Sequence, residues 1–312
     1  MKNIFFLVFL FSIVANSQEP KNNSIEPFLP EIISEFPNVR DISISSNGRE
    51  MYFSVQSYMG DLSAIVVIRK EADDWSKPEV ASFSGKFHDI EPFLSPDGLK
   101  LYYASKRPVI ASEVTSKDFD IWFVERTDIN SKWSQPINLG EPINTPGNEF
   151  YPAITTNGNL YFTSDGPASL GKDDIFFSKY INGKYTTPIS LESSINSEGY
   201  EFNAFVAPDE TFLIFTGYNR KDGFGSGDLY ISYKNKEGHW AIAKNLGETV
   251  NSSKLDYCPF VDLATNTLYF TSKRNIIKKS FTTQQSVKTL LDEMNIYQNG
   301  LSRLYKIPFS KL

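Results

Sequence analysis

The feature that most constrains this chain is a segment that recurs five times. Each copy joins a short turn to a run of aromatic and aliphatic residues, as in SPDGLKLYYAS and TTNGNLYFTS. The copies begin at Ser45, Ser95, Thr155, Ala207 and Asp262, so successive starts lie 50, 60, 52 and 55 residues apart. Self-similarity at this period predicts one structural unit that is built repeatedly around a common core.

Each copy is predicted to form a β-hairpin. Asn47-Gly48, Asp97-Gly98 and Asn157-Gly158 place residues that tolerate positive φ at a tight turn, and strand-forming side chains follow each turn. Copies four and five carry Asp209-Glu210 and Thr265-Asn266 instead. We therefore expect longer loops or another turn type in those two copies.

Two further segments follow the hairpin. The third segment carries an aspartate before an apolar strand in three units, at Asp120, Asp174 and Asp228. The fourth begins with an aromatic residue and in three units holds a proline three positions later, as in Trp133 and Pro136. Proline suits an edge strand, because an edge strand can spare a backbone donor. Four strands per unit, repeated radially, predict an all-β fold, the β-propeller.

Counting the strands leaves one gap at the end of the chain. The last unit stops after its third strand, at residues 304–309. Residues 25–34 precede the first hairpin and resemble a fourth segment, so we expect them to act as a closing strand of the last blade. The prediction is a single domain over 25–312 with five four-stranded blades, closed by an N-terminal strand. Six blades would require a unit that the repeat search does not show.

The first 17 residues have the pattern of a signal peptide. A lysine precedes the apolar run from Ile4 to Val14, and small residues precede Gln18, where cleavage is expected. Residues 18–24 would then be a short linker. The apolar run is too short to span a bilayer and no later stretch is long enough. We therefore expect an exported chain, periplasmic or secreted, without membrane insertion.

Composition restricts the possible partners and the redox chemistry. The net charge of −6 argues against nucleic acid. Cys258 is the only cysteine, so no intramolecular disulfide can form, and its apolar neighbours predict a buried, inert thiol.

The hairpin pattern, the third-strand aspartate and the W-x-x-P-x-N-L-G run of residues 133–140 together resemble the TolB-type, WD-like β-propeller repeat proteins. The resemblance covers residues 25–309 and is to exported proteins of Bacteroidetes-like bacteria. It implies the fold and export. It implies little about activity, because propellers include both binding proteins and enzymes.

Acids and arginines recur in the loops at one end of the expected ring. In three loops an acid follows an asparagine by five residues and directly precedes the inner strand, and a fourth acid holds the equivalent position. The connections after the second strands hold arginines, and these lie on the same face. The candidate mouth of the central channel therefore consists of Asp89, Glu149, Glu201, Asp256, Arg107, Arg220 and Arg274.

Two interpretations of this mouth remain open. In the first, the acids and arginines pair across blade boundaries, with the asparagines bonding the turn backbone. In the second, they form a polar or cation-binding ligand site. The acid spacing matches neither an EF-hand nor a zinc pattern, so no metal and no cofactor are assigned.

The remaining polar residues do not suggest catalysis. The third-strand aspartates recur in like positions, which favours a structural role, because catalytic groups need unlike environments. His88 and His239 lie in different units, which argues against a histidine-based triad.

The last unit contains an insertion at residues 275–299. Val287, Leu290, Leu291 and Met294 recur there at helical spacing. We expect a short helix that packs on the propeller as a lid, with Val287, Leu290 and Leu291 facing the body. The alternative is a docking face for a partner.

These patterns favour a monomeric binding or scaffold protein that recognises a protein, peptide or glycan at the mouth. The alternative is a carbohydrate-active hydrolase or lyase with Glu149, Glu201 or Asp256 as acid and base. Two carboxylates about 5 to 10 Å apart with unlike environments would favour the enzyme.

Overall fold

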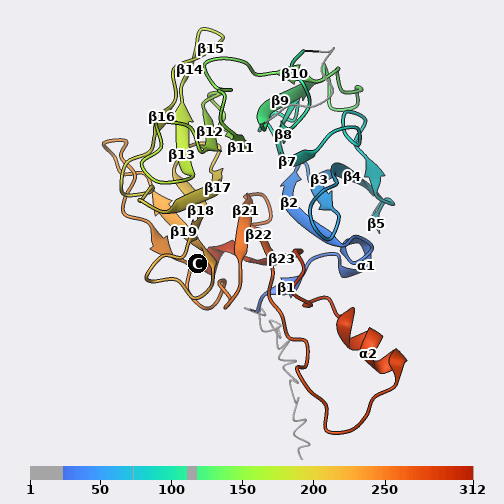
Figure 1. Ribbon diagram of the computed structural model, residues 1–312. Helices are drawn as coiled ribbons and strands as arrows, with labels where there is room; N and C mark the ends of the chain where they lie inside the picture. The colour runs from blue at the N-terminus through green and yellow to red at the C-terminus, as the bar shows by residue number, and fades with distance from the viewer. Residues whose placement is uncertain (1–23, 73, 111–117, 312) are drawn as a thin grey trace, which may run out of the picture.

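The computed structural model describes residues 24–72, 74–110 and 118–311. Over these residues the chain forms a ring of five antiparallel sheets, four of them with four strands and the first with a fifth short strand (Figure 1). The predicted all-β propeller with five blades is therefore confirmed. The expected signal peptide at 1–17 lies outside the described residues. Over the described ranges, no helix has the length and apolar character needed to cross a membrane.

Each blade runs outward from an inner strand that faces the axis. The inner strands are β2 (Asn38–Ile44), β7 (Asp89–Leu94), β11 (Glu149–Ile154), β17 (Tyr200–Val206) and β21 (Asp256–Asp262). The second strands are β3 (Glu50–Gln56), β8 (Lys100–Ser105), β12 (Leu160–Ser164), β18 (Phe212–Tyr218) and β22 (Thr267–Ser272). The third strands are β4 (Ser63–Glu71), β9 (Asp120–Glu125), β13 (Asp174–Ser178), β19 (Gly227–Tyr233) and β23 (Arg303–Pro308).

The outer strands are short, since each spans only two residues. They are β6 (Glu79–Val80), β10 (Ile137–Asn138), β16 (Ile189–Ser190), β20 (Lys244–Asn245) and, for the last blade, β1 (Glu26–Pro27). Three further short strands are present: β5 (Asp74–Trp75) pairs with β4 in the first blade, and β14 (Tyr180–Ile181) pairs with β15 (Lys184–Tyr185) in a separate two-stranded sheet. Short outer strands leave little exposed edge for pairing with another chain.

The N-terminal segment closes the ring, but with a shorter strand than expected. Glu26 and Pro27 pair with Lys306 and Tyr305 of β23. The expected strand over 25–34 ends at Pro27, and Pro30–Ile33 form the short helix α1 instead. Proline at the start of this segment suits a first helical turn, because its φ is fixed and no N–H partner is needed there.

Apolar burial secures this closing segment. The Phe28 backbone N–H donates to the Leu304 carbonyl at 3.0 Å. The Phe28 ring packs edge-to-face on Tyr269 with ring centroids 4.9 Å apart, and Ile33 is fully buried. The segment therefore contributes side chains to the core as well as two residues to the sheet.

The hairpin turns differ from the expectation in copy four. The Glu210 N–H donates to the Ala207 carbonyl at 2.8 Å, as the Gly98 N–H donates to Ser95, so the turn is the same. Glu210 adopts a φ of 60° at the position that glycine holds elsewhere. Its carboxylate accepts hydrogen bonds from Asn159 and from Lys234, and these contacts hold the unfavourable backbone. Copy five has a loop of the same length, between Asp262 and Thr267, but its positive φ falls one position later, at Asn266, so the turn is of another type.

Every inner strand carries a β-bulge near its middle. Pairing with the second strand shifts register at this point in all five blades. One residue in each bulge has a positive φ: Asp41, Glu91, Tyr151, Asn203 and Cys258. A bulge redirects side chains, and here it affects the five strands that surround the axis.

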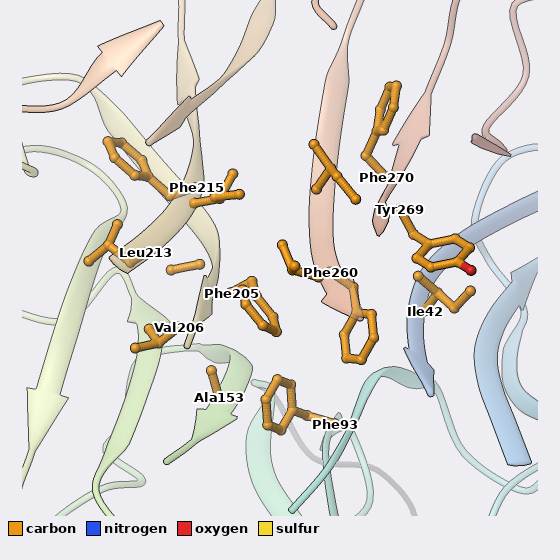
Figure 2. Close-up of a cluster of buried hydrophobic side chains, with 14 of the residues drawn as sticks. Ile42, Phe93, Ala153, Phe205, Val206, Leu213, Phe215, Phe260, Tyr269 and Phe270 are labelled. Carbon is orange, nitrogen blue, oxygen red and sulfur yellow. The ribbon is translucent and has the colours of Figure 1, made fainter. Parts of the chain in front are cut away.

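Aromatic side chains fill the axis on the turn side of these bulges. Figure 2 shows Phe93, Phe205 and Phe260 converging from three blades. The Phe205 ring lies 5.4 Å from Phe260 and 6.5 Å from Phe93, measured between centroids. This apolar cluster packs the turn side of the channel, while the bulge residues lie nearer the opposite end.

Candidate functional site

The four predicted acids lie at the entry ends of their inner strands and are fully buried. Three of them are bound by the predicted arginines: Asp89 by Arg107, Glu201 by Arg220 and Asp256 by Arg274. The structure thus brings six of the seven residues together as pairs. Each pair lies within one blade.

The hydrogen bonds of Arg107 show how such an ion pair holds its blade together. Its Nη2 donates to Asp89 Oδ1 at 2.8 Å and to the Phe83 carbonyl at 3.0 Å, and its Nε donates to Ser105 Oγ at 2.9 Å. Phe83 lies in the connection that enters this blade from the preceding one. The arginine therefore fixes an inter-blade connection onto the first two strands of a single blade.

The same arrangement recurs in the last blade. Arg274 Nη2 donates to Asp256 Oδ1 and to the Val250 carbonyl, each at 2.9 Å. The expected ion pairing across blade boundaries is therefore wrong. The register of neighbouring blades is set by the connections that the arginines hold.

Glu149 is the acid without an arginine. The third blade has Gly166 two residues after Ser164, where the second and last blades have arginine two residues after a serine. Glu149 accepts hydrogen bonds from the hydroxyl and the N–H of Thr145, at 2.6 and 3.1 Å. Burial raises the pKa of Glu149 to about 8, against the opposing effect of these bonds.

The repeated asparagines and aspartates have structural roles. Asn251 binds the backbone of Leu229 on a third strand, accepting from its N–H at 2.8 Å and donating to its carbonyl at 3.1 Å. The expected bonding to turn backbone is thus replaced by bonding to strand backbone. Asp174 accepts from the hydroxyl of Ser190 and the N–H of Leu170, both at 2.6 Å, which confirms the structural role expected for such aspartates.

The five bulge residues form a polar ring around the axis, together with Arg40. Arg40 donates to Asp41 at 2.8 Å, and also to Glu91 and to the Cys258 sulfur. The Cys258 thiol donates to Asn203 Oδ1 at 3.3 Å. Blades one, two, four and five are joined by these contacts.

Glu91 is the most connected member of this polar ring. Beyond Arg40, its carboxylate accepts from the Tyr151 N–H at 2.7 Å and from Asn203 Nδ2 at 3.1 Å. Burial raises the pKa of the Glu91 carboxyl well above its ordinary value, although Arg40 opposes the shift. Burial likewise raises the pKa of the Cys258 thiol, which fits the expected buried, inert cysteine.

A pocket of about 440 Å³ opens above the polar ring, at the end of the propeller where the blades are connected. Arg40, Glu91 and Asn203 reach it from below, and its walls include the rings of Phe150, Phe202 and Tyr257. Its volume lies within the range of small-ligand sites. None of the seven predicted mouth residues lines this pocket in the part of the chain that the structure describes.

The sequence did contain a signal for the polar ring. Its five bulge residues each stand four positions before the start of a repeat, at 41, 91, 151, 203 and 258 against 45, 95, 155, 207 and 262. The residues on either side of this position are similar in the five copies, whereas the residue at the position itself is different in each copy. A position where equivalent strands carry Asp, Glu, Tyr, Asn and Cys indicates a site whose chemistry is not set by the repeat.

Exposed apolar side chains lie at the same end of the propeller as the pocket. They lie in the connections between second and third strands, and each of the five blades supplies at least one. Examples are Tyr58, Met59, Val109, Leu170, Phe224 and Ile276, which we call the apolar rim. Met59 is 84% exposed and Leu170 is 59% exposed. The opposite end also exposes large apolar side chains, among them Leu263 in a hairpin turn and Ile129 and Ile181 in connections that follow third strands.

The insertion of the last blade does not form the expected lid. It does contain a helix, α2 (Val287–Met294), capped by the Ser286 hydroxyl. Figure 1 shows α2 standing away from the blades. Val287 is 75% exposed and no residue of the helix is buried, so the expected packing of Val287, Leu290 and Leu291 on the body is wrong. Amphipathic spacing predicts that these residues form a helix, but it does not show whether another surface packs on the apolar face.

Several solved structures are similar to this chain at low sequence identity. TolB from Acinetobacter baumannii is similar over 86% of this chain and 54% of its own, with 12% identity and a TM-score of 0.48. BT0996, solved in a complex with RGII, is similar over 92% of this chain and 88% of its own, with 8% identity and a TM-score of 0.50. A GH62 hydrolase solved with xylotriose covers 87% of this chain and 91% of its own, with 12% identity and a TM-score of 0.49.

No family model matches the sequence, and no curated protein matches it. The assignment of the fold as a five-bladed β-propeller therefore rests on the sheets of the structure itself.

Proposed function

We propose that this propeller is a binding protein that takes a segment of a protein or peptide partner at its pocket end. The observation that carries the proposal is the apolar rim, to which all five blades contribute at the end of the propeller that holds the pocket, and from which Tyr58 and Met59 line the pocket itself. Concentrated exposed apolar side chains mark interaction sites, whereas scattered ones are ordinary.

The rim and the pocket would make different contributions to binding. Aliphatic side chains such as Met59 and Leu170 gain free energy when a partner removes them from water. The pocket offers Arg40 and Asn203 as donors and the Glu91 carboxylate as an acceptor, so it suits the polar tip of an inserted segment. An extended segment with apolar side chains beside a polar tip would satisfy both.

A glycan is the other ligand class that the pocket chemistry would suit, because aromatic walls beside polar groups also bind sugars. The rim favours the peptide, since exposed aliphatic side chains bury more readily against apolar protein surface than against hydroxyls.

Carbohydrate hydrolysis is the second candidate function, with different residues from those predicted. Glu149, Glu201 and Asp256 are buried outside the pocket, but Glu91 and Asp173 both line it. Burial raises the pKa of both carboxyls, which is the condition that a general acid requires.

Random peptides displayed on phage test the proposal directly. Enriched peptides would be synthesised and titrated calorimetrically against the wild type, a Met59→Asp/Leu170→Asp double variant and a Phe202→Ala pocket variant. Leu263→Asp, an exposed site on the opposite end, is the matched control. We expect losses of about tenfold or more for the rim and pocket variants, and less than about twofold for the control.

Three outcomes would contradict peptide binding. Peptides that bind the rim variant as well as the wild type would place their site elsewhere. Binding of a neutral oligosaccharide panel without peptide enrichment would indicate a glycan. Turnover of nitrophenyl glycosides that is lost in Glu91→Gln would establish the enzyme.

We further propose that the protein is exported, on the basis of the signal-peptide pattern of residues 1–17. N-terminal sequencing of the mature protein from its own host tests this, and Gln18 is the expected first residue.

A further inference from the structure

A second recess lies at the turn end of the propeller, on the opposite side from the pocket. It occupies about 830 Å³ between the β2–β3 turn of the first blade and residues 126–136 of the second blade. It shares no lining residue with the central pocket. We call it the basic groove, because five cationic side chains line it: Arg49, Arg69, Lys70, Arg126 and Lys132.

The charges in this groove do not balance. Glu50 is the only acidic side chain that lines it, and it pairs with Arg126 at 2.6 Å and with Arg69 at 3.8 Å. Arg69 also pairs with Glu79 at the margin, at 3.1 Å. Arg49, Lys70 and Lys132 have no ion pair among the described residues.

A positive surface of this kind is unexpected on this chain. The whole sequence carries a net charge of −6, so its average field repels anions. Three unpaired cations on two facing walls produce a local field of the opposite sign, and a recess strengthens such a field. The groove is therefore complementary to an anionic ligand that reaches both blades.

One wall of the basic groove is rigid. Arg126 is 8% exposed, lies 4.2 Å from the ring centroid of Trp133 and donates to the Gly98 carbonyl at 2.9 Å. The Trp133 indole N–H donates to the Tyr52 hydroxyl at 3.1 Å. These contacts fix the tryptophan and the guanidinium before any ligand arrives, which lowers the entropy cost of binding.

A neighbouring recess extends the basic groove along the first blade. It occupies about 540 Å³ and shares Asn47, Arg49 and Lys70 with it. Trp75 lines this extension, so a half-buried tryptophan lies on either side of the β2–β3 turn. The extension reaches the last blade, where the acid Asp262 lines it, so the two recesses together are lined by three blades and suit a ligand of several units rather than a single phosphate or carboxylate.

We propose that the basic groove binds an acidic oligosaccharide, a chain of sugars that bear carboxylates or sulfates. Cations supply the charge recognition, tryptophan rings can lie against sugar faces, and Asn130 and Gln135 offer amides for hydroxyl groups. An acidic peptide fits less well, because turns and loops form most of the walls, and Arg69 and Lys70 lie on β4, which already pairs with β3 and β5 and leaves no strand edge for the main chain of a peptide.

The experiment is a calorimetric titration of the full-length protein with four defined probes. These are a galacturonate oligosaccharide, a heparin-derived oligosaccharide, neutral maltohexaose and a poly-glutamate peptide. The test variant is Arg49→Ala/Lys70→Ala/Lys132→Ala. Its matched control is Lys184→Ala/Lys236→Ala/Lys244→Ala, which removes the same charge from exposed positions elsewhere. Thermal melting confirms that both variants remain folded.

We expect an acidic oligosaccharide to bind the wild type, with an affinity that falls as salt rises, and maltohexaose not to bind. The groove variant should lose about tenfold or more in affinity, and the control less than about twofold. If the carboxylated probe binds and the sulfated one does not, or the reverse, the anionic group is identified.

Four results would overturn the proposal. They are failure of both acidic oligosaccharides to bind, equal losses in the two triple variants, binding as tight for maltohexaose, or binding of poly-glutamate alone. The central pocket contributes no residue to this test, so its outcome is independent of the proposed peptide binding.

Discussion

Arg274 and Asp256 meet at 2.9 Å inside the last blade, and neither residue reaches across to a neighbouring blade. Asp256 is fully buried, while Arg274 also lies over the Tyr305 ring at 4.6 Å. The carboxylate therefore depends on one guanidinium for its charge compensation.

Replacing this arginine should be strongly destabilising. Arg274→Met keeps much of the side-chain volume but leaves Asp256 charged and buried, at a cost of about 3–5 kcal/mol in unfolding free energy. Urea denaturation measures the effect. Lys273→Met is the control, because Lys273 is exposed, and it should change stability by about 0.5 kcal/mol or less. Equal effects would show that the ion pair has no energetic role.

Glu149 should behave in the opposite way to Asp256. Glu149→Gln removes a buried acid that has no arginine partner, so at pH 9 the variant should be at least as stable as the wild type. Urea midpoints at that pH test this, with Glu201→Gln as the matched change in a blade that has its arginine. If Glu149→Gln lowered the urea midpoint as much as Glu201→Gln does, the predicted difference between the two acids would be wrong.

The same residue predicts a pH dependence. The pKa of Glu149 is raised to about 8 in the folded protein. The protonated carboxyl therefore contributes to the unfolding free energy fully below the ordinary pKa of glutamate, and this contribution is lost as pH rises through about 8. The slope is at most about 1.4 kcal/mol per pH unit. Unfolding free energies of the wild type and Glu149→Gln between pH 5 and 9 should converge or cross. Parallel curves would show an unshifted pKa.

Ring closure by the N-terminal segment can be tested at Phe28. Phe28→Ala removes a ring that is 8% exposed and packs on Tyr269, so we expect a loss of about 3–5 kcal/mol. Glu31→Ala, exposed on the same segment, should have little effect. A Phe28→Ala variant that melts like the parent would mean that closure contributes nothing to stability.

A substitution on the exposed helix α2 should leave the stability of the protein almost unchanged. Val287→Asp places an acid at the start of the helix, where the backbone favours negative charge, and it covers no apolar surface. The melting temperature should change by less than about 2 °C. A larger drop would show that the helix packs on the blades in solution.

The sequence predicted the fold because its signals are local and recur. Turn residues such as Asn47-Gly48 and the strands beside them define a hairpin without knowledge of the remaining chain, and five repeats define the ring. Closure by the N-terminal segment followed from counting strands. The short helix α1 was missed because its residues were included in the expected closing strand, of which only Glu26 and Pro27 pair.

The site was only partly predictable, for a physical reason. Similarity between copies draws attention to residues that repeat, such as Glu201 and Asp256, and repeated residues in like positions hold the blades together. The residues of the polar ring differ from copy to copy, so aligning the copies hides them. Contacts such as Arg40 with Cys258 join positions 218 residues apart and have no local signature.

Pairing of β1 with β23 has a consequence for how the molecule is made. The first of these strands leaves the ribosome well before the second, yet they are neighbours in one sheet. Contacts so distant in sequence are slow to form, because a long loop must close first. Arg40 lies on β2 of the first blade and Cys258 on β21 of the last blade, and these two blades meet where the ring closes. The floor of the central pocket is therefore completed only when the first and last blades have met.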